Sequence, residues 1–272
     1  MTVSSSRKNI LLNILPSPGG RPLSEIETWI FDLDNTLYPA SCRLFDQIHS
    51  RMQRFVAERL ELSLDQALVV QKTYFREHGT TMRGLMTVDK VDPHEFLAYV
   101  HDIDLACVPP DPVLAAALKA LPGRKIVHTN GSVAHARRLL DHLDIAGSFC
   151  GIVDIVDAGF EPKPALAGYY ELLRRHQVAP HTAMMIEDMA KNLVPAGALG
   201  MTTAWMRGTI DWAAAGAEGS HIHYVVDDLG RFLTAAAGLD IPTRAECFEP
   251  NWKQDSEEAE TAKLLPTGRN LW

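Results

Sequence analysis

The chain has 272 residues, 46% hydrophobic and 22% charged, which is ordinary for a soluble globular protein with one large domain or a core plus a smaller insert. Its 26 basic and 34 acidic residues give a formal net charge of −8, which argues against a nucleic-acid-binding surface. No apolar run approaches the ~20 residues that a membrane-spanning helix needs, so no membrane partner is expected.

The four cysteines are widely separated and form no C-x-x-C pair, which disfavours a zinc site or a disulfide framework. Free thiols in a reducing cytosol are the better interpretation, and we expect a cytoplasmic protein. These cysteines are Cys42, Cys107, Cys150 and Cys247.

Residues 1–24 are rich in Ser, Pro and Gly and are expected to form a flexible tail. The apolar stretch after Arg7 faintly resembles a signal peptide, but Asn13 interrupts it and no small-residue cleavage site follows. Residues 241–272 mix acidic and polar side chains with isolated tryptophans and are expected to be a second tail.

The first predicted strand, Trp29 to Phe31, runs into two aspartates, Asp32 and Asp34. Side chains alternate along a strand, so both carboxylates can point the same way, off its carboxyl end. Ligands bind at that edge of an open α/β sheet. Paired carboxylates repel and raise each other's pKa unless a cation neutralises them. The pair therefore indicates a metal, or chemistry with one carboxylate as nucleophile and the other as acid or base.

Residues 43–107 are expected to form a helical domain inserted after this strand. Apolar residues recur at helical spacing over 45–56, and a second helix is predicted from the Ser63 cap to Glu77. A loop is predicted over 78–85, and a further helix near Pro93.

From Pro112 onward helices and strands alternate, which predicts a doubly wound parallel α/β sheet with residues 25–42 and 108–240 as the core. The predicted helices cover residues 113–120, 133–143, 165–176 and 190–199. The predicted strands cover residues 125–129, 152–156, 183–186, 201–205 and 224–226.

Polar residues follow the later strands, as they follow the first. Thr129 and Asn130 precede a helix whose backbone N–H groups can hold an anionic oxygen. Lys163 lies between two prolines, which stiffen its loop. Glu187 and Asp188 end a fourth strand. Carboxylates, a hydroxyl and a lysine at one sheet edge suit Mg²⁺-dependent phosphoryl transfer through an aspartyl-phosphate.

The ordered motifs Asp-x-Asp-x-Thr, Thr, Lys and an acidic pair resemble the haloacid dehalogenase superfamily over about residues 26–230. The resemblance implies Asp32 as nucleophile and Asp34 as general acid, then base. Members resembling the true dehalogenases lack the second aspartate, so Asp34 favours a phosphatase or phosphomutase.

The same resemblance implies that Thr129 binds phosphate and that Lys163 steadies Asp32 and the phosphoryl group. Mg²⁺ would be held by Asp32, by the Asp34 backbone carbonyl and by Asp188, with Glu187 supporting it indirectly or through water. The helical insert would be a cap that closes over the site and selects the substrate.

A narrower resemblance is to the pyrimidine 5′-nucleotidase branch, which dephosphorylates small nucleotides such as UMP and CMP. It depends on the segment 32–39, on Gly79–Leu85 in the cap, and on Thr129–Ser132 followed by His135 and Ala136. Arg83 is then a candidate substrate contact, with Tyr38 packing nearby.

Each residue also has a simpler interpretation. Aspartates are common turn-formers, Asn130 or Ser132 can cap a helix, and an isolated lysine is usually on the surface. Arg83 is equally compatible with a salt bridge within the cap. The pair His221-x-His223 is expected to be the exposed start of a strand.

The sequence therefore predicts a Mg²⁺-dependent phosphomonoesterase acting on a small phosphorylated metabolite, with a pyrimidine nucleotide favoured. Sugar-phosphate or phosphoglycolate phosphatases, phosphomutases and a non-catalytic phosphometabolite-binding module are the alternatives. The predicted catalytic residues are Asp32, Asp34 and Lys163, the substrate-binding residues Thr129, Asn130 and Arg83, and the metal ligands Asp32, Asp34, Asp188 and Glu187.

Overall fold

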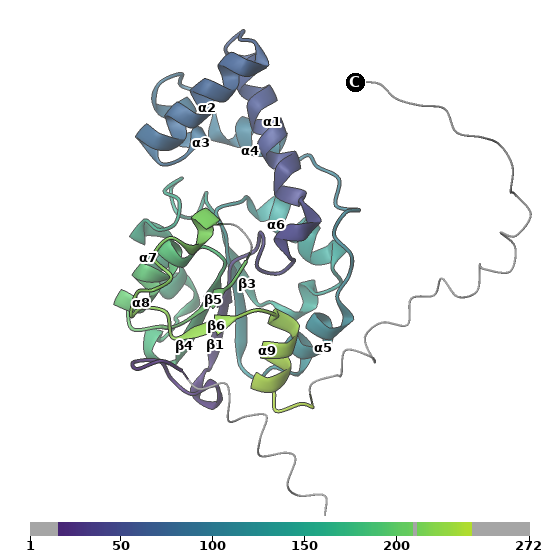
Figure 1. Ribbon diagram of the computed structural model, residues 1–272, viewed down its shortest axis with the longest axis vertical. Coiled ribbons are helices and arrows are strands. Elements are labelled where there is room, and N and C mark those ends of the chain that lie inside the picture. The colour runs from purple at the N-terminus through teal and green to yellow at the C-terminus, as the bar shows by residue number, and fades with distance from the viewer. Residues whose placement is uncertain (1–15, 209–210, 241–272) are drawn as a thin grey trace, which may run out of the picture. The chain divides into compact units, whose positions relative to one another are not determined.

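A sheet of parallel strands forms the centre of the structure, a computed structural model that describes residues 16–208 and 211–240 (Figure 1). The strand order is β3-β2-β1-β4-β5-β6, and every neighbouring pair is parallel. The predicted doubly wound parallel fold is confirmed. The strands are β1 (Thr28–Phe31), β2 (Arg124–His128), β3 (Gly151–Val153), β4 (Ala183–Glu187), β5 (Thr202–Met206) and β6 (Tyr224–Val226).

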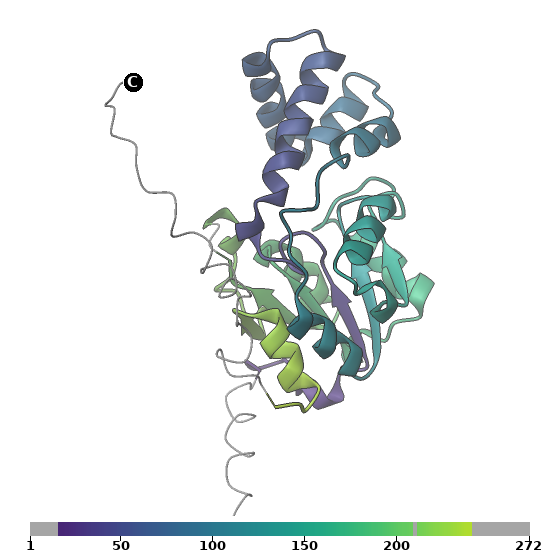
Figure 2. The ribbon, with the colours of Figure 1, turned by 90° about the vertical axis from the view of Figure 1, so that its right-hand side faces the viewer.

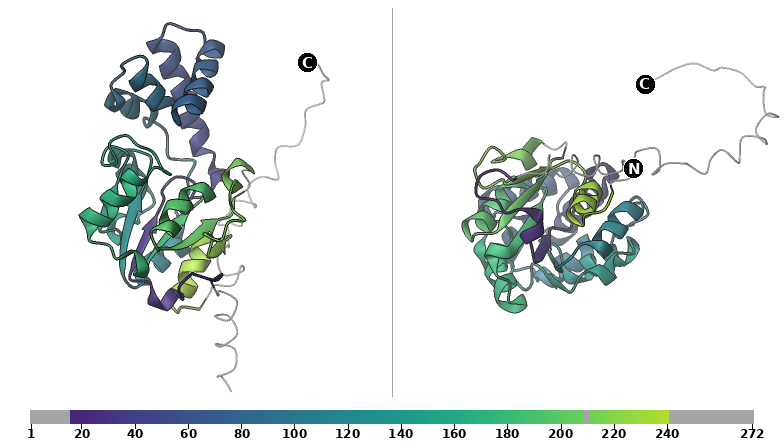
Figure 3. Two further views of the ribbon diagram at one scale, coloured as in Figure 1. Left: turned by 90° about the vertical axis from the view of Figure 1, so that its left-hand side faces the viewer. Right: turned by 90° about the horizontal axis from the view of Figure 1, so that it is seen from below.

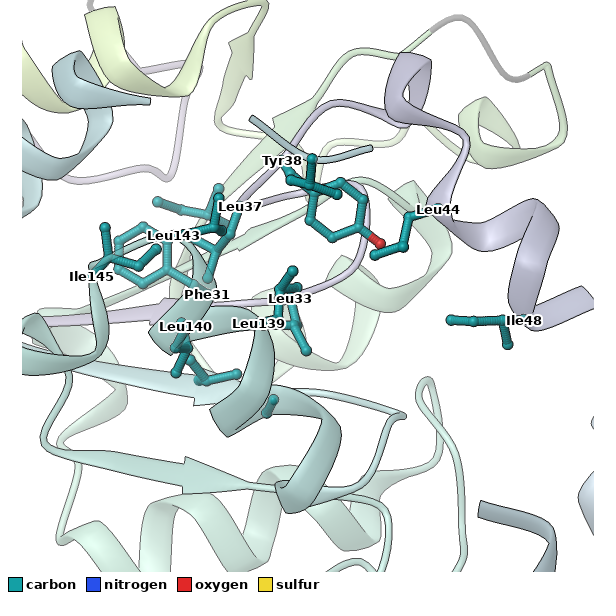
Figure 4. Close-up of a cluster of buried hydrophobic side chains, with 14 of the residues drawn as sticks. Phe31, Leu33, Leu37, Tyr38, Leu44, Ile48, Leu139, Leu140, Leu143 and Ile145 are labelled. Carbon is teal, nitrogen blue, oxygen red and sulfur yellow. The ribbon is translucent and has the colours of Figure 1, made fainter. Parts of the chain in front are cut away.

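Helices cover both faces of the sheet, which explains why most of its strand residues are apolar. In β1, Trp29 and Phe31 pack into one hydrophobic cluster and Ile30 into the other. Figure 4 shows Phe31 among side chains of the first cluster, including Leu139 and Ile145. The helices on that face are α5 (Pro112–Ala120), α6 (Val133–His142) and α9 (Leu229–Ala236), and those on the other are α7 (Leu166–His176) and α8 (Ala190–Ala198).

Four helices occupy the chain between β1 and α5 and pack against one another (Figures 2 and 3). These helices and the sheet belong to one compact unit that ends at Leu239, so the contacts within the chain do not divide them into two domains. The boundaries of a cap domain at residues 43–107 therefore stay a prediction. These helices are α1 (Leu44–Arg59), α2 (Leu64–His78), α3 (Thr81–Thr87) and α4 (Pro93–Val100).

Two elements differ from the sequence-based expectation. The segment 78–85 is not one loop, because only Gly79 and Thr80 interrupt the helices and the Thr80 hydroxyl accepts a hydrogen bond from Arg83 N at the start of α3. Helix α9 was not predicted, although Asp228 caps it by accepting a hydrogen bond from Arg231 N. Both helices are short, so hydrophobic periodicity has little length over which to accumulate.

Residues 16–24, expected to be part of a flexible tail, instead hydrogen-bond to the end of the sheet. Ser17 N donates to His223 O, and Arg21 N donates to the Thr202 hydroxyl. His223 itself is buried, not exposed as predicted, and its Nδ1 accepts a hydrogen bond from Thr203 N. The glycines of the N-terminal segment permit this packing, since a Cβ on Gly20 would lie 2.6 Å from His223 Cβ.

The predicted tails over 1–15 and 241–272 lie outside the described residues, as does Cys247. The cysteines within the described ranges, Cys42, Cys107 and Cys150, are free. Among the helices that the structure describes, none combines the length and hydropathy that a bilayer-spanning segment requires.

Replacing Gly84 by Ala is expected to lower the free energy of unfolding by roughly 1–3 kcal/mol, the usual cost of overpacking. Gly84 is buried in α3, and an added Cβ would overlap Tyr74 Cβ and Cγ on α2. Atoms so close to the backbone of Tyr74 cannot rotate away. Denaturant unfolding measures the effect. Gly147→Ala is the control, since its Cβ would meet no atom within 4 Å, and equal stability of the two variants would contradict this packing.

Candidate active site

The sheet order places the polar strand ends side by side. The chain turns in opposite directions from β1 and β4, which are neighbours, so the crevice beyond their carboxyl ends is the expected ligand site. Asp32 directly follows β1, Glu187 ends β4, and Thr129 directly follows β2 on the other side of β1. Three segments far apart in sequence therefore contribute to one edge.

Asp32 is buried and ion-paired. Its backbone N–H extends the sheet by donating to Ile186 O at 2.9 Å. Its Oδ1 lies 2.5 Å from Lys163 Nζ, and its Oδ2 accepts a hydrogen bond from the Thr36 hydroxyl at 3.2 Å. Both carboxylate oxygens are thus held in place, within reach of the crevice.

Lys163 links two acidic residues from different strands. Its ammonium group donates to Asp32, to Glu187 Oε2 at 2.7 Å and to His128 O at 2.8 Å. The two carboxylates outweigh the effect of burial and raise the pKa of Lys163 above its usual value. Its loop is held in turn by the Asn130 side-chain oxygen, which accepts from Lys163 N at 2.8 Å.

Three carboxylates gather at this point, and among the described residues Lys163 is the one lysine that pairs with them. Oxygens of Asp32, Glu187 and Asp188 all lie within 4.8 Å of one another. Burial and the charge of Glu187 raise the pKa of Asp32 to about 7, against the opposing effect of Lys163, and that of Asp188 to about 9. Buried carboxylates with raised pKa values can all be ionised at neutral pH only if a further positive charge lies beside them. Since all the donors are carboxylate oxygens, the cluster fits a hard divalent cation.

Asp34 belongs to a separate network. Its Oδ1 accepts hydrogen bonds from the Tyr38 hydroxyl at 2.8 Å and from His135 Nε2 at 2.9 Å. Burial opposes ionisation of Asp34, but His135 and Tyr38 outweigh it and lower the pKa of this carboxyl. The carboxylate of Asp34 is not in the acidic cluster, and its predicted contact with the metal through the backbone carbonyl stays a prediction.

The remaining predicted residues lie in different settings. Thr129 is buried directly after the end of β2, where its hydroxyl accepts from Gly131 N at 2.9 Å. Arg83 of α3 pairs with Glu161, in the loop that also carries Lys163. A second contact between the same regions is made by His94 and Phe160, whose ring centroids are 5.4 Å apart.

Sequence reasoning gave no role to His135 and described Tyr38 only as packing nearby. Both donate to Asp34, which lies four residues from Tyr38 and 101 residues from His135 in the chain. A signal for His135 was present, because it lies one turn into the helix that follows Thr129. Which acceptor it reaches depends on the fold and cannot be taken from spacing.

A cavity of about 850 Å³ lies away from these carboxylates. It is lined by residues of α4, α6, β3 and α7, including His94, Arg137 and Ile152. None of Asp32, Glu187 and Asp188 lines it. The candidate site is therefore identified by its cluster of carboxylates and lysine, and not by the presence of a cavity.

The parallel α/β sheet with three carboxylates and a lysine at one edge indicates a class of proteins, and a comparison with family models shows which one it is. A family model of haloacid dehalogenase-like hydrolases matches residues 26–200, more than half of the chain. The protein belongs to this family of haloacid dehalogenase-like hydrolases, and the predicted superfamily is confirmed.

Similarity to individual proteins is weaker. A segment of 138 residues is 28% identical to "Phosphate metabolism protein 8" of Saccharomyces cerevisiae, covering 46% of this chain and 42% of that protein. The chain thus matches less than half the length of this curated relative.

Two solved structures share the fold. A HAD phosphatase from Thermococcus onnurineus aligns with a TM-score of 0.56 and 17% identity, over 79% of this chain and 99% of its own. A predicted phosphatase from Clostridium acetobutylicum aligns with a TM-score of 0.52 and 16% identity, over 79% and 99%. At these identities the likeness supports the fold alone.

The acidic cluster predicts how cation binding depends on pH. Both raised carboxyl pKa values lie above the unfolded value of 3.8. The folded, cation-free protein therefore holds protons that the unfolded chain releases, and its stability falls as pH rises from about 4 to about 9. A divalent cation displaces those protons, so its binding strengthens over the same range.

Thermal unfolding with MgCl₂ and with EDTA, at pH 5.5 and at pH 8.5, measures this effect. The rise in Tm caused by the cation is expected to be larger at pH 8.5 in the native protein and small at both values in Asp188→Asn. A rise that is equal at the two pH values, or larger at pH 5.5, would contradict the assignment of the cation to this cluster.

Proposed function

We propose that the protein is a Mg²⁺-dependent phosphomonoesterase that forms an aspartyl-phosphate on Asp32. One observation carries the proposal. The two carboxylates of the Asp-x-Asp pair have different partners, since Asp32 lies in the acidic cluster with Lys163 whereas Asp34 is bonded to Tyr38 and His135. Such a separation suits one carboxylate as nucleophile and the other as proton carrier.

In the first half-reaction a carboxylate oxygen of Asp32 forms a bond to phosphorus while the bond to the leaving oxygen breaks. The leaving oxygen takes the proton of Asp34, so a neutral alcohol departs. The lowered pKa of Asp34 leaves it ionised in the free protein at neutral pH. A phosphate dianion beside it adds negative charge and favours the proton uptake that the acid needs.

In the second half-reaction Asp34 accepts a proton from water as the water oxygen bonds to phosphorus. The bond from phosphorus to Asp32 breaks, which restores its carboxylate and releases phosphate. Lys163 and the Thr129 hydroxyl would balance charge on the phosphoryl oxygens. Asp32 and Asp188 would hold Mg²⁺, with the backbone carbonyl of Asp34, and Glu187 would support them. The bound ion would neutralise part of the phosphoryl charge.

For the substrate we propose a pyrimidine nucleoside monophosphate. Its support is the resemblance of the segment 79–85, together with the position of Arg83, whose partner Glu161 belongs to the Lys163 loop. Arg83 is 37% exposed and can exchange that carboxylate for a substrate group. Helices α1–α4 would act as the cap that selects the substrate.

The test is phosphate release from pyrimidine and purine monophosphates, sugar phosphates and phosphoglycolate, with and without Mg²⁺. UMP and CMP are expected to have the highest kcat/KM, and EDTA is expected to abolish release. Turnover of sugar phosphates with nucleotides ignored would refute the substrate class but keep the chemistry. No release from any ester, by a protein that binds them, would favour the non-catalytic module.

A further inference from the structure

Within residues 16–208 and 211–240, the side chain of Asp34 accepts hydrogen bonds through only one of its two oxygens. Tyr38 and His135 both donate to Oδ1. A Cβ placed on Gly131 would lie 3.7 Å from Asp34 Oδ2 and 3.3 Å from Thr129 Oγ1, so Oδ2 lies on the side of the Thr129 turn. A carboxyl group that gains a proton keeps one oxygen as a pure acceptor. Because two donors already point at Oδ1, a proton added to this carboxyl is favoured on Oδ2, where it does not crowd them.

His135 reaches Asp34 with a ring that cannot turn freely. Its side chain has no exposed surface, and it stacks on His101 with centroids 4.4 Å apart and planes 9° from parallel. An ionised carboxylate can only accept hydrogen bonds, so in the bond between His135 and Asp34 the proton is on Nε2 of the histidine. Nδ1 is buried with no hydrogen-bond partner among the described residues, so the bond to Asp34 is the only one the ring makes there.

The residue that stacks on His135 is itself fixed to α6. The Ser132 hydroxyl lies 3.1 Å from His101 Nδ1, and the Arg138 guanidinium donates to His101 O and to Ile103 O. Along the helix, Ser132 and His135 are three residues apart, as are His135 and Arg138, so each pair is adjacent on its surface. Residues 101–103 are therefore held on α6. The stacked rings of His101 and His135 are both anchored to this helix, which packs on the sheet.

We propose that His135 is a positioning residue for proton transfer, a role that rests on the proposed phosphatase activity. It holds Asp34 through Oδ1 and so directs Oδ2, the oxygen that delivers the proton, towards the phosphate site. The covalent steps are those already described, with the Oδ2–H bond breaking as the leaving oxygen gains its proton.

The test compares esters that differ in their need for an acid. 4-Nitrophenyl phosphate has a stable leaving anion, whereas phenyl phosphate depends on protonation. kcat/KM is measured for both esters with Mg²⁺ in the wild type, in Asp34→Asn, in His135→Leu and in His135→Gln. His142→Leu is the matched control, since it removes a similar bond, from Nε2 to Val108 O at 2.7 Å, at the far end of the same helix.

Asp34→Asn is expected to lose ~10²–10⁴-fold on phenyl phosphate and much less on the nitrophenyl ester. His135→Leu should show the same selectivity with a loss of about tenfold, the usual worth of one hydrogen bond, and His135→Gln, which keeps an amide donor, should recover part of it. His142→Leu should affect both esters equally.

Equal losses on both esters in His135→Leu and in His135→Gln, while Asp34→Asn remains selective, overturn the role of His135 alone. If His135→Leu does not fold, a partial loss in His135→Gln that is larger on phenyl phosphate than on the nitrophenyl ester supports the role, and an equal loss on both esters, or no loss, overturns it. If the wild type releases phosphate from neither ester nor from any nucleotide, the phosphatase proposal fails and the role of His135 fails with it.

Discussion

Asp32→Asn is expected to lower phosphate release on the order of 10⁴-fold or more, as loss of a nucleophile does in enzymes with covalent intermediates. The amide keeps the size of the side chain, and its single oxygen can still accept from Lys163, as Oδ1 of Asp32 does, but the amide nitrogen cannot accept from Thr36 and the group cannot attack phosphorus. Replacement also removes one of three mutually repelling carboxylates. The cation-free variant should therefore be at least as stable as the wild type.

Phosphate release and thermal unfolding, both with and without Mg²⁺, measure this prediction. Asp141→Asn is the control, because that aspartate is exposed on α6 and does not belong to the acidic cluster. Residual activity within about tenfold of the wild type would contradict Asp32 as nucleophile. A large loss of stability would show that the loss of activity reflects unfolding.

Lys163→Met is expected to impair both activity and stability. Methionine matches the length of the lysine but leaves Asp32 and Glu187 without their positive partner in a buried setting. Breaking such a pair from one side costs ~3–5 kcal/mol, and loss of a charged donor to the phosphoryl oxygens lowers kcat roughly 10²–10³-fold. Lowering the pH protonates the carboxylates, so the stability deficit should shrink between pH 8 and pH 5.5.

Unfolding in EDTA at both pH values and turnover in saturating Mg²⁺ measure the two effects separately. Lys125→Met is the matched control, since Lys125 is also buried but, in the part of the chain that the structure describes, donates to the carbonyl oxygens of Leu121 and Gly123 and to no carboxylate. Its stability deficit should not shrink at low pH, and its turnover should be close to that of the wild type. The same pH response in both variants would contradict the electrostatic role of Lys163.

The sheet was predictable because burial on both faces makes its strands predominantly apolar, as in Trp29–Phe31 and Ala183–Ile186. The helix and strand boundaries mostly differ by one or two residues, as for α6, predicted over 133–143 and observed over Val133–His142. The largest discrepancies are α3 and α9. The segment 78–85 was predicted as a loop, but Gly84 lies inside α3, where the close approach of Tyr74 leaves no room for a Cβ. That close approach depends on the neighbouring helix and is invisible in the local sequence.

The residues at the strand ends were predictable for a similar reason, because parallel strands bring their carboxyl ends to one edge. This places Asp32, Lys163 and the acidic pair in one region without any knowledge of side-chain contacts. The partners of Asp34 were not predictable. His135 reaches it across 101 residues, and its stacking on His101 depends on how residues 101–103 dock onto α6.

Trapping the covalent intermediate is the most direct test of the central claim. The protein is mixed with a phosphate-labelled nucleotide and Mg²⁺, quenched in acid within the first turnover, digested and examined for labelled peptides. We expect one phosphoryl group on the peptide that contains Asp32, labile to hydroxylamine and missing in Asp32→Asn. Rapid phosphate release with no labelled peptide, or a label on any other residue, would contradict an aspartyl-phosphate on Asp32.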